Sequence, residues 1–71
     1  MKFHYYPETD SLYIELSERA GMEAKVVAPG VVLDFDENHY LVGIDIDHAS
    51  TLVNLSTLEA TSLPVRTLAV A

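Results

Sequence analysis

Cysteine is absent from the 71-residue sequence, so disulfide bonds and thiolate metal sites are excluded. No apolar stretch approaches the roughly 20 residues that a helix needs to span a bilayer. The first residues also lack the charged and apolar regions of a signal peptide. Because a cysteine-free chain fits the reducing cytosol, these absences predict a soluble cytoplasmic protein that makes no membrane contact.

Basic residues are scarce: four Lys and Arg stand against eleven Asp and Glu, and the formal net charge is −7. An acidic surface repels the phosphates of nucleic acids and anionic membranes, so direct DNA or RNA binding is not expected. A basic protein or a cation is the partner that this charge favours. The hydrophobic share of 49% is too high for a disordered acidic tail.

The chain is short, and we assign residues 1–71 to a single domain. A domain of this size buries only about 60% of the surface of its unfolded chain. Small domains usually need disulfides, a metal or a partner subunit as further support. Since cysteine is absent, self-association is favoured over a non-thiolate metal site, and the sequence predicts a homodimer without a cofactor.

The N-terminal segment alternates apolar and polar residues with the period of two that is typical of strands. A turn at "PETD" (7–10) allows Tyr6 to pair with Ser11 in a hairpin. The other pairs are Phe3–Ile14 and Tyr5–Leu12 on the core face, and Lys2–Glu15 and His4–Tyr13 on the opposite face. A slip of one residue would lose every one of these matches.

Residues 31–47 alternate in the same way and predict a second hairpin, with Asn38 and His39 as its two-residue turn. Glu37 then pairs with Tyr40. The apolar pairs on the core face are Phe35–Val42, Leu33–Ile44 and Val31–Ile46. Four aspartates at two-residue spacing fall on the other, outer face: Asp34, Asp36, Asp45 and Asp47. The hydrophobic pattern therefore predicts that these carboxylates face water.

The segment "EAKVVA" (23–28) is predicted to be a further strand. Pro29 and Gly30 after it fit the two central positions of a type II turn. This turn type suits a two-residue hairpin badly, so a hairpin and a bulge or corner both remain open at this point.

The period changes after residue 48, where leucines recur at helix-like intervals. Ser56 and Glu59 match a capping box and predict a short helix over 57–62. Pro64 ends the helix, since the residue before proline disfavours helical dihedrals. Residues 65–71 are predicted to form either a last strand or an arm that reaches a neighbour.

Together these elements predict an α+β fold: an antiparallel β-meander of four to five strands with a short C-terminal α-helix packed on one face. The expected core consists of Phe3, Tyr5, Leu12, Ile14, Leu16, Val31, Leu33, Phe35, Val42, Ile44, Ile46, Leu55 and Leu58.

Three stretches, "YYPETDSLYIEL", "VAPGVVLDFDENHYLVGIDIDHAS" and "LSTLEATSLP", resemble the YuzE-like family of small bacterial and archaeal proteins of unknown function (domain-of-unknown-function family 2283). The resemblance covers nearly the whole chain, although members commonly carry glycine at the hairpin turn where this chain has His39. It implies no established activity and no catalytic residues. Because some members are thought to be encoded beside small RNase-like toxins, it implies an antitoxin-like role.

The four aspartates are the first candidate site. A hard cation needs several oxygens within about 2.0–2.6 Å, whereas Asp34 and Asp36 on one strand have Cα atoms about 6.6–6.8 Å apart. Asp45 and Asp47 share that spacing, and no calcium-binding loop is present. A solvated sheet face is the favoured interpretation, and a small-ligand or divalent-cation site on these aspartates is the alternative.

The histidines and serines do not form a recognisable reactive set. His4, His39 and His48 lack the spacing of a helical metal motif, and no serine lies in a nucleophile elbow. His48 is expected to cap or line the junction between strand and helix. We therefore assign no catalytic residue and no metal ligand.

The outer face also carries aromatic and aliphatic side chains, and exposed patches of this kind usually mark contact surfaces. The predicted partner-binding residues are Tyr6, Tyr13, Val32, Asp34, Asp36, Leu41, Asp45 and Asp47. The resulting hypothesis is a non-catalytic interaction module, dimeric, whose acidic face binds a basic partner. Combined with the family resemblance, that partner is a small basic toxin.

Overall fold

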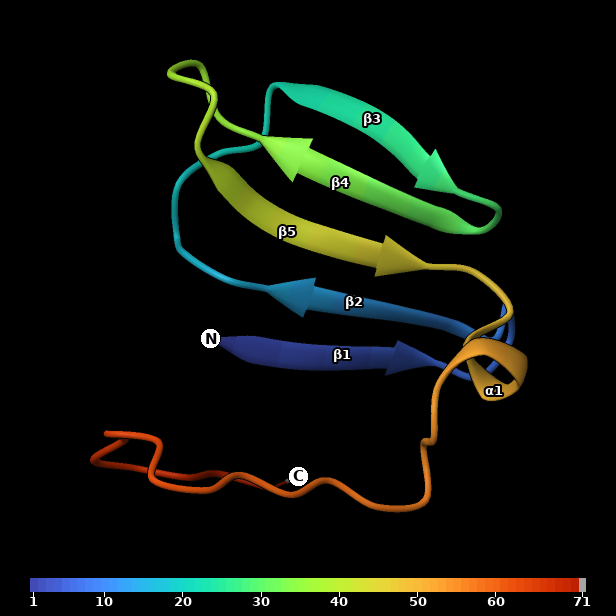
Figure 1. Ribbon diagram of the computed structural model, residues 1–71, viewed down its shortest axis with the longest axis vertical. Helices are drawn as coiled ribbons and strands as arrows, with labels where there is room; N and C mark the ends of the chain where they lie inside the picture. Colours follow the sequence, from blue (N-terminus) through green and yellow to red (C-terminus); the bar gives the residue numbers. More distant parts are fainter. Residues whose placement is uncertain (71) are drawn as a thin grey trace.

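The computed structural model describes residues 1–70, which form one five-stranded antiparallel sheet, one turn of helix and a C-terminal segment (Figure 1). The elements are β1 (Lys2–Tyr6), β2 (Ser11–Glu15), β3 (Glu23–Ala28), β4 (Val31–Phe35), β5 (Leu41–Ile46) and α1 (Ala49–Leu52). The predicted α+β class and the antiparallel sheet are confirmed.

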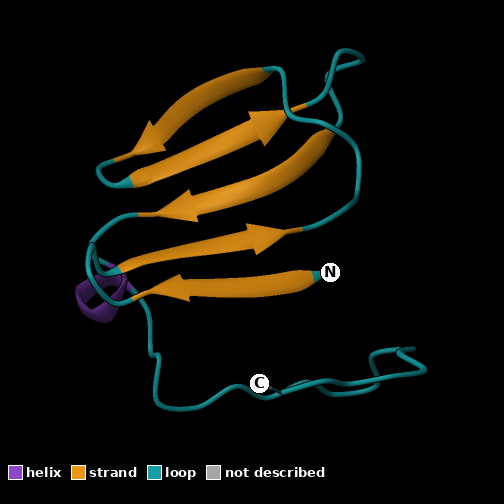
Figure 2. Ribbon diagram, turned by 180° about the vertical axis from the view of Figure 1, so that it is seen from behind, coloured by secondary structure: helices purple, strands orange, loops and turns teal. Residues whose placement is uncertain are grey.

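The strand order is β1-β2-β5-β4-β3. The sheet therefore joins two units, the β1–β2 hairpin and the β3–β4–β5 meander, through the pairing of β2 with β5. The connection from β2 to β3 runs along one end of the sheet in both views (Figures 1 and 2). This connection lets β5, the last strand in the chain, occupy the centre of the sheet.

The register of β1 and β2 agrees with the prediction at all five pairs, from Lys2 opposite Glu15 to Tyr6 opposite Ser11. Lys2 Nζ lies 4.0 Å from Glu15 Oε2. An exposed ion pair of this kind contributes little to stability. The hydrophobic alternation on the two strands, rather than the charge pair, therefore specifies the register.

The pairing of β4 with β5 agrees with the prediction at four positions and then departs from it. The expected pairs from Val31–Ile46 to Asp34–Gly43 are present. Phe35 pairs with Leu41 instead of Val42, because a bulge interrupts the register after Asp34. The predicted Phe35–Val42 and Glu37–Tyr40 pairs are therefore wrong.

The turn between β4 and β5 is one residue longer than predicted. The Asp36 N–H donates to the Tyr40 carbonyl (2.9 Å) and the His39 N–H donates to the Asp36 carbonyl (3.1 Å). His39 has a φ of 66°, as the last residue of a three-residue loop requires. A two-residue type I′ turn would need positive φ at two non-glycine residues, which explains why the longer loop forms.

Pro29 and Gly30 connect β3 and β4 as a two-residue loop, since Ala28 pairs directly with Val31. Gly30 has a φ of 78°, the value expected at the third position of a type II turn. The register shifts between Val26 and Ala28, so a bulge lies directly before the turn. Bulges increase local twist, which compensates for the poor match between this turn and the twist of the strands. The hairpin and the bulge left open by the sequence are thus both present.

The helix predicted over 57–62 is absent from the described residues, and the single helical turn lies earlier, at Ala49–Leu52. Ser56 does not form a capping box, because its N–H and hydroxyl both donate to Asn54 Oδ1 (3.0 and 2.6 Å). Short helices are marginal without a surface to pack on, and Leu58 is 73% exposed. Residues 65–70 form no strand, and residue 71 lies outside the described chain.

The buried hydrophobic residues are Leu12, Val42, Ile46 and Ala49. Three of the four were predicted, and Ala49 enters because α1 packs against Leu12 and Ile46. Four predicted core residues are exposed instead: Phe3, Tyr5, Leu55 and Leu58. All four are exposed for the same reason: no second layer of the described chain covers the apolar face of the sheet.

None of the described helices is long and apolar enough to cross a membrane.

The core assignment predicts very different costs for two identical truncations. Leu12→Ala should lower the free energy of unfolding by about 2–5 kcal/mol because it opens a cavity beside Ile46 and Ala49. Leu58→Ala removes an exposed side chain and should change it by less than about 0.5 kcal/mol. Urea unfolding followed by circular dichroism measures both, and equal losses would contradict this core.

Candidate functional site

One side of the sheet carries most of the predicted partner-binding residues. We call this side the outer face, and the opposite side, which contains Leu12 and Ile46, the inner face. By strand register, the outer face contains Lys2, His4, Tyr6, Ser11, Tyr13, Glu15, Ala24, Val26, Val32, Asp34, Gly43 and Asp45.

Tyr13 lies at the centre of the outer face. Its ring covers the backbone of Gly43, where a side-chain Cβ would come within 2.7 Å of the Tyr13 Cζ atom. Any larger residue at position 43 would therefore displace the ring. Burial raises the pKa of the Tyr13 hydroxyl, and the nearby carboxylates of Asp34 and Glu15 raise it further. The aromatic ring thus lies among negative charges.

Asp34 and Asp45 are the two predicted site carboxylates that the structure brings together with Tyr13. Tyr13 pairs directly with Asp45, while Asp34 lies opposite Gly43 on the neighbouring strand. The pKa of the Asp45 carboxyl is raised, first by burial and then by the charges of Asp47 and Asp34. Neither Asp34 nor Asp45 has an ion-pair partner within the described chain. Their negative charge is therefore not neutralised locally.

Asp36 differs from the expectation that all four aspartates face water. It is 5% exposed, and its Oδ1 accepts the N–H groups of Asn38 and Tyr40, each at 2.9 Å. Arg19 Nε lies 2.9 Å from Asp36 Oδ2. The longer turn after the bulge explains this placement, because it draws Asp36 out of the strand alternation and into the turn.

The electrostatic balance at Asp36 is opposite to that at Asp45. Burial alone raises the pKa of the Asp36 carboxyl, but the N–H donors of Tyr40 and Asn38 and the charge of Arg19 outweigh it, so the pKa is lowered. Arg19 also lies over the Tyr40 ring, 5.2 Å from its centroid. Asp36 therefore stabilises the β4–β5 turn and is not free to bind a partner.

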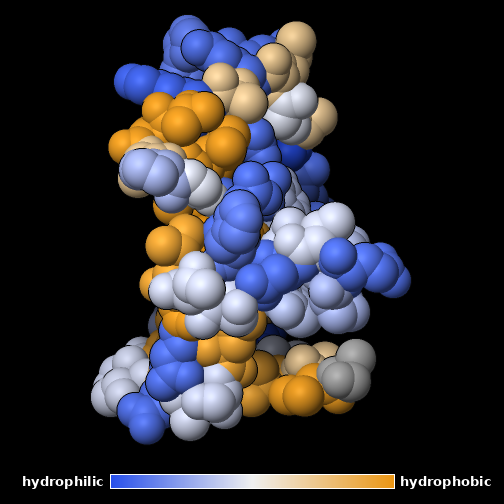
Figure 3. Space-filling view, turned by 90° about the vertical axis from the view of Figure 1, so that its right-hand side faces the viewer, coloured by the Kyte–Doolittle hydropathy of each residue, from blue (hydrophilic) through white to orange (hydrophobic). Residues whose placement is uncertain are grey.

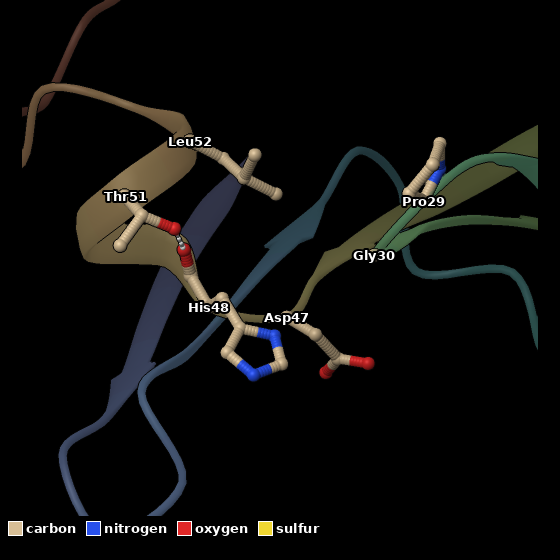
Figure 4. Close-up of a pocket in the computed structure, with 6 residues that line it drawn as sticks. All are labelled: Pro29, Gly30, Asp47, His48, Thr51 and Leu52. Carbon is tan, nitrogen blue, oxygen red and sulfur yellow. Dashed lines mark hydrogen bonds between the residues drawn. The ribbon is translucent and has the colours of Figure 1, made fainter.

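Asp47 lies at the end of β5, close enough to Asp45 for its charge to raise the pKa of the Asp45 carboxyl, and its Oδ1 accepts the Ser11 hydroxyl at 3.4 Å. It lines a shallow pocket between the β3–β4 turn and α1, together with Pro29, Gly30, His48, Thr51 and Leu52 (Figure 4). The Asp47 and His48 side chains extend from the chain on the same side, whereas Leu52 extends toward Pro29. This pocket has an apolar wall, and its three polar side chains, Asp47, His48 and Thr51, do not converge on one point.

His48 occupies the predicted junction between β5 and α1. It is the N-cap residue of α1 with a φ of 52°, but its side chain makes no capping hydrogen bond. The Thr51 hydroxyl donates to the His48 carbonyl at 2.8 Å. His48 therefore lines the junction through its backbone.

Asp10 is a structural residue that the sequence indicated only as a turn former. The Tyr5 hydroxyl donates to Asp10 Oδ1 (2.8 Å), and the Ser50 hydroxyl donates to Asp10 Oδ2 (2.7 Å). The hydrogen bonds from Ser50 and Tyr5 lower the pKa of the Asp10 carboxyl. Asp10 thus ties the β1–β2 turn to α1. No pattern in the sequence signals this link across 40 residues, since it depends on the fold.

Within residues 1–70, no three His, Asp or Glu side chains lie close enough to hold a metal ion together. The four predicted aspartates are divided among the outer face, the β4–β5 turn and the end of β5. The structure therefore brings Asp34 and Asp45 together beside Tyr13, with Asp47 close to Asp45 at the end of β5, and separates Asp36 from them.

Two aspartate substitutions should shift stability in opposite directions. Asp36→Asn weakens the turn and should lower the melting temperature at neutral pH by about 4–8 °C. Because the pKa of Asp36 is lowered in the folded protein, its stabilisation is lost as the pH falls through that pKa. The difference in melting temperature between wild type and Asp36→Asn should therefore vanish in acid. Glu37→Gln, an exposed neighbour, is the matched control and should melt as wild type does.

Asp45→Asn should instead raise the melting temperature at neutral pH. A raised carboxyl pKa means that folding disfavours the ionised form, and this cost is complete above the folded pKa and absent in strong acid. Glu8→Gln makes the same charge change at an exposed turn position. A rise of equal size in both variants would show that net charge, rather than the surroundings of Asp45, is responsible.

The comparisons with known proteins identify a family without an assigned activity. No curated protein and no solved structure matches the chain. A family model described as "Protein of unknown function (DUF2283)" matches residues 2–50, which include all five strands and the first residues of α1. The chain therefore belongs to the DUF2283 family of proteins of unknown function.

Proposed function

We propose that this protein is a non-catalytic interaction module whose outer face binds a basic segment of a partner protein. The observation that carries the proposal is the meeting of Asp34 and Asp45 beside Tyr13 without a cation to neutralise them. Burial first, and then the charges of Asp47 and Asp34, raise the pKa of the Asp45 carboxyl, so desolvation and repulsion from these neighbours both disfavour its ionised form. A Lys or Arg from a partner would relieve this repulsion on binding.

The composition of the outer face suits a protein partner better than a nucleic acid. Its carboxylates repel phosphates, and the formal net charge of −7 extends that repulsion over the molecule. Tyr13 adds a large ring that can contact an aliphatic Lys stem or stack on an Arg guanidinium. Tyr6, 49% exposed on the same face, adds a second aromatic group of the kind enriched at interfaces.

The family resemblance makes the proposed partner more specific. In that form, the protein is the antitoxin-like partner of a small basic toxin. The acidic outer face supports this version only through charge complementarity, which accelerates encounter and weakens as salt rises. A cytoplasmic location belongs to the same proposal.

The test is capture of partners from an extract of the protein's own cells on three immobilised forms: wild type, Asp34→Asn/Asp45→Asn and Glu8→Gln/Glu37→Gln. The two double variants have the same net charge, but only the first alters the outer face. We expect a basic protein to bind wild type and the Glu8/Glu37 control at low salt and to elute at high salt. The Asp34→Asn/Asp45→Asn variant should capture much less of this basic protein than wild type does.

The captured protein is then purified and titrated against the same three forms by calorimetry. Equal weakening in both double variants would indicate net charge alone and would contradict a site at Asp34 and Asp45. If no basic protein binds at low salt, the proposal fails. Titration with Ca²⁺, Mg²⁺ and Mn²⁺ tests the alternative in which these aspartates bind a cation. A bound cation would raise the melting temperature.

A further inference from the structure

The inner face of the sheet is apolar and lacks a covering layer. Its central rows contain Phe3, Tyr5, Ile14, Val31, Leu33 and Ile44. Phe3 and Tyr5 are 48% and 45% exposed, and the other four are only partly buried. Seen from the side, hydrophobic groups gather along one side of the molecule and hydrophilic groups along the other (Figure 3).

The protein exposes more surface than its mass accounts for. Its accessible surface is 5884 Å², whereas a compact monomer of 7.8 kDa exposes about 4400 Å². Its radius of gyration of 13.0 Å likewise exceeds the roughly 11 Å of a compact domain of this length. The uncovered inner face and the exposed, extended residues 54–70 both contribute to this excess of about 1500 Å² per chain. Each subunit of an obligate homodimer buries an area of similar size.

The C-terminal segment does not supply the missing layer. Residues 54–70 run beyond the β1 edge and do not overlap the sheet in either of the two opposite views (Figures 1 and 2). α1 and Val53 pack on the inner face at the corner formed by Leu12 and Ile46. The rest of the inner face therefore needs an occupant from another chain.

We propose that the occupant is a second copy of this chain, packed inner face to inner face. A two-fold dimer uses the same patch on both subunits, and two sheets stacked about 10 Å apart form a common core. Strand register places only Glu23 and Lys25 as charged residues among the paired positions of this face, both on the edge strand β3. The centre of the interface is therefore uncharged.

Charge selects this arrangement over an association through the outer faces. Each chain has a formal net charge of −7, and an outer-face dimer would bring the Asp34 and Asp45 carboxylates of both copies together. Like charges in contact cost several kcal/mol at an interface. Stacking the inner faces instead keeps the two acidic faces on opposite outer sides of the dimer. The proposal is independent of the basic partner, which binds the other face.

Neighbouring residues on β1 provide a matched pair of variants, because Phe3 faces inward and His4 faces outward. Sedimentation equilibrium from low micromolar to near-millimolar concentration should show a wild-type dimer. Phe3→Lys buries a charge in the interface and should raise the dimer dissociation constant more than about tenfold. His4→Lys should leave it unchanged. A wild-type monomer throughout, or equal weakening by both variants, would overturn the proposal.

A second measurement does not depend on Phe3→Lys remaining folded. Because the chain has no cysteine, single replacements can be labelled selectively with a maleimide dye. Phe3→Cys should react slowly at high protein concentration and faster on dilution, whereas Tyr6→Cys on the outer face should react at one rate. The reverse pattern would assign self-association to the outer face, and two constant rates would exclude the dimer.

Discussion

The pairing of β2 with β5 is the constraint on which the rest of the structure depends. It places Leu12 opposite Ile46 on the inner face and, one residue further, Tyr13 opposite Asp45 on the outer face. The first pair forms the small core with Ala49, while the second begins the acidic cluster. Because side chains alternate with a period of two, one register sets both the core and the site. A slip of one residue would exchange the faces.

This dependence explains which features could be predicted from sequence. Strand register follows from local alternation of apolar and polar residues, so the β1–β2 pairs and four of the β4–β5 pairs were correct. The meeting of Asp34 and Asp45 beside Tyr13 was not predicted, because it depends on the pairing of β2 with β5. The predicted β4–β5 turn was wrong because a two-residue turn needs two consecutive residues with positive φ, and only His39 adopts a positive φ in this loop. The 57–62 helix was wrong because the capping signal at Ser56 has no packing surface behind it.

Asp36 and Asp45 show why residue type and spacing did not suffice for the site. Both are aspartates in the alternating stretch, yet the pKa of one is lowered and that of the other is raised. The difference comes from the donors that surround each group. Asp36 has two N–H groups and Arg19 as partners, whereas Asp45 is partly desolvated and has Asp47 and Asp34 as negatively charged neighbours. The turn geometry that supplies donors to Asp36 is the part that alternation does not encode.

The two faces of the sheet pose opposite physical problems, and this opposition links the two proposals. The inner face has apolar surface without cover, which an uncharged, self-complementary contact resolves. The outer face has two carboxylates, Asp34 and Asp45, without counter-charge, and a partner chain of basic composition would neutralise them. A dimer stacked through its inner faces would present two identical acidic faces pointing in opposite directions, so each copy would bind its partner without blocking the other. Self-association and partner binding are therefore compatible, because the register that separates apolar from acidic side chains also separates the two contacts in space.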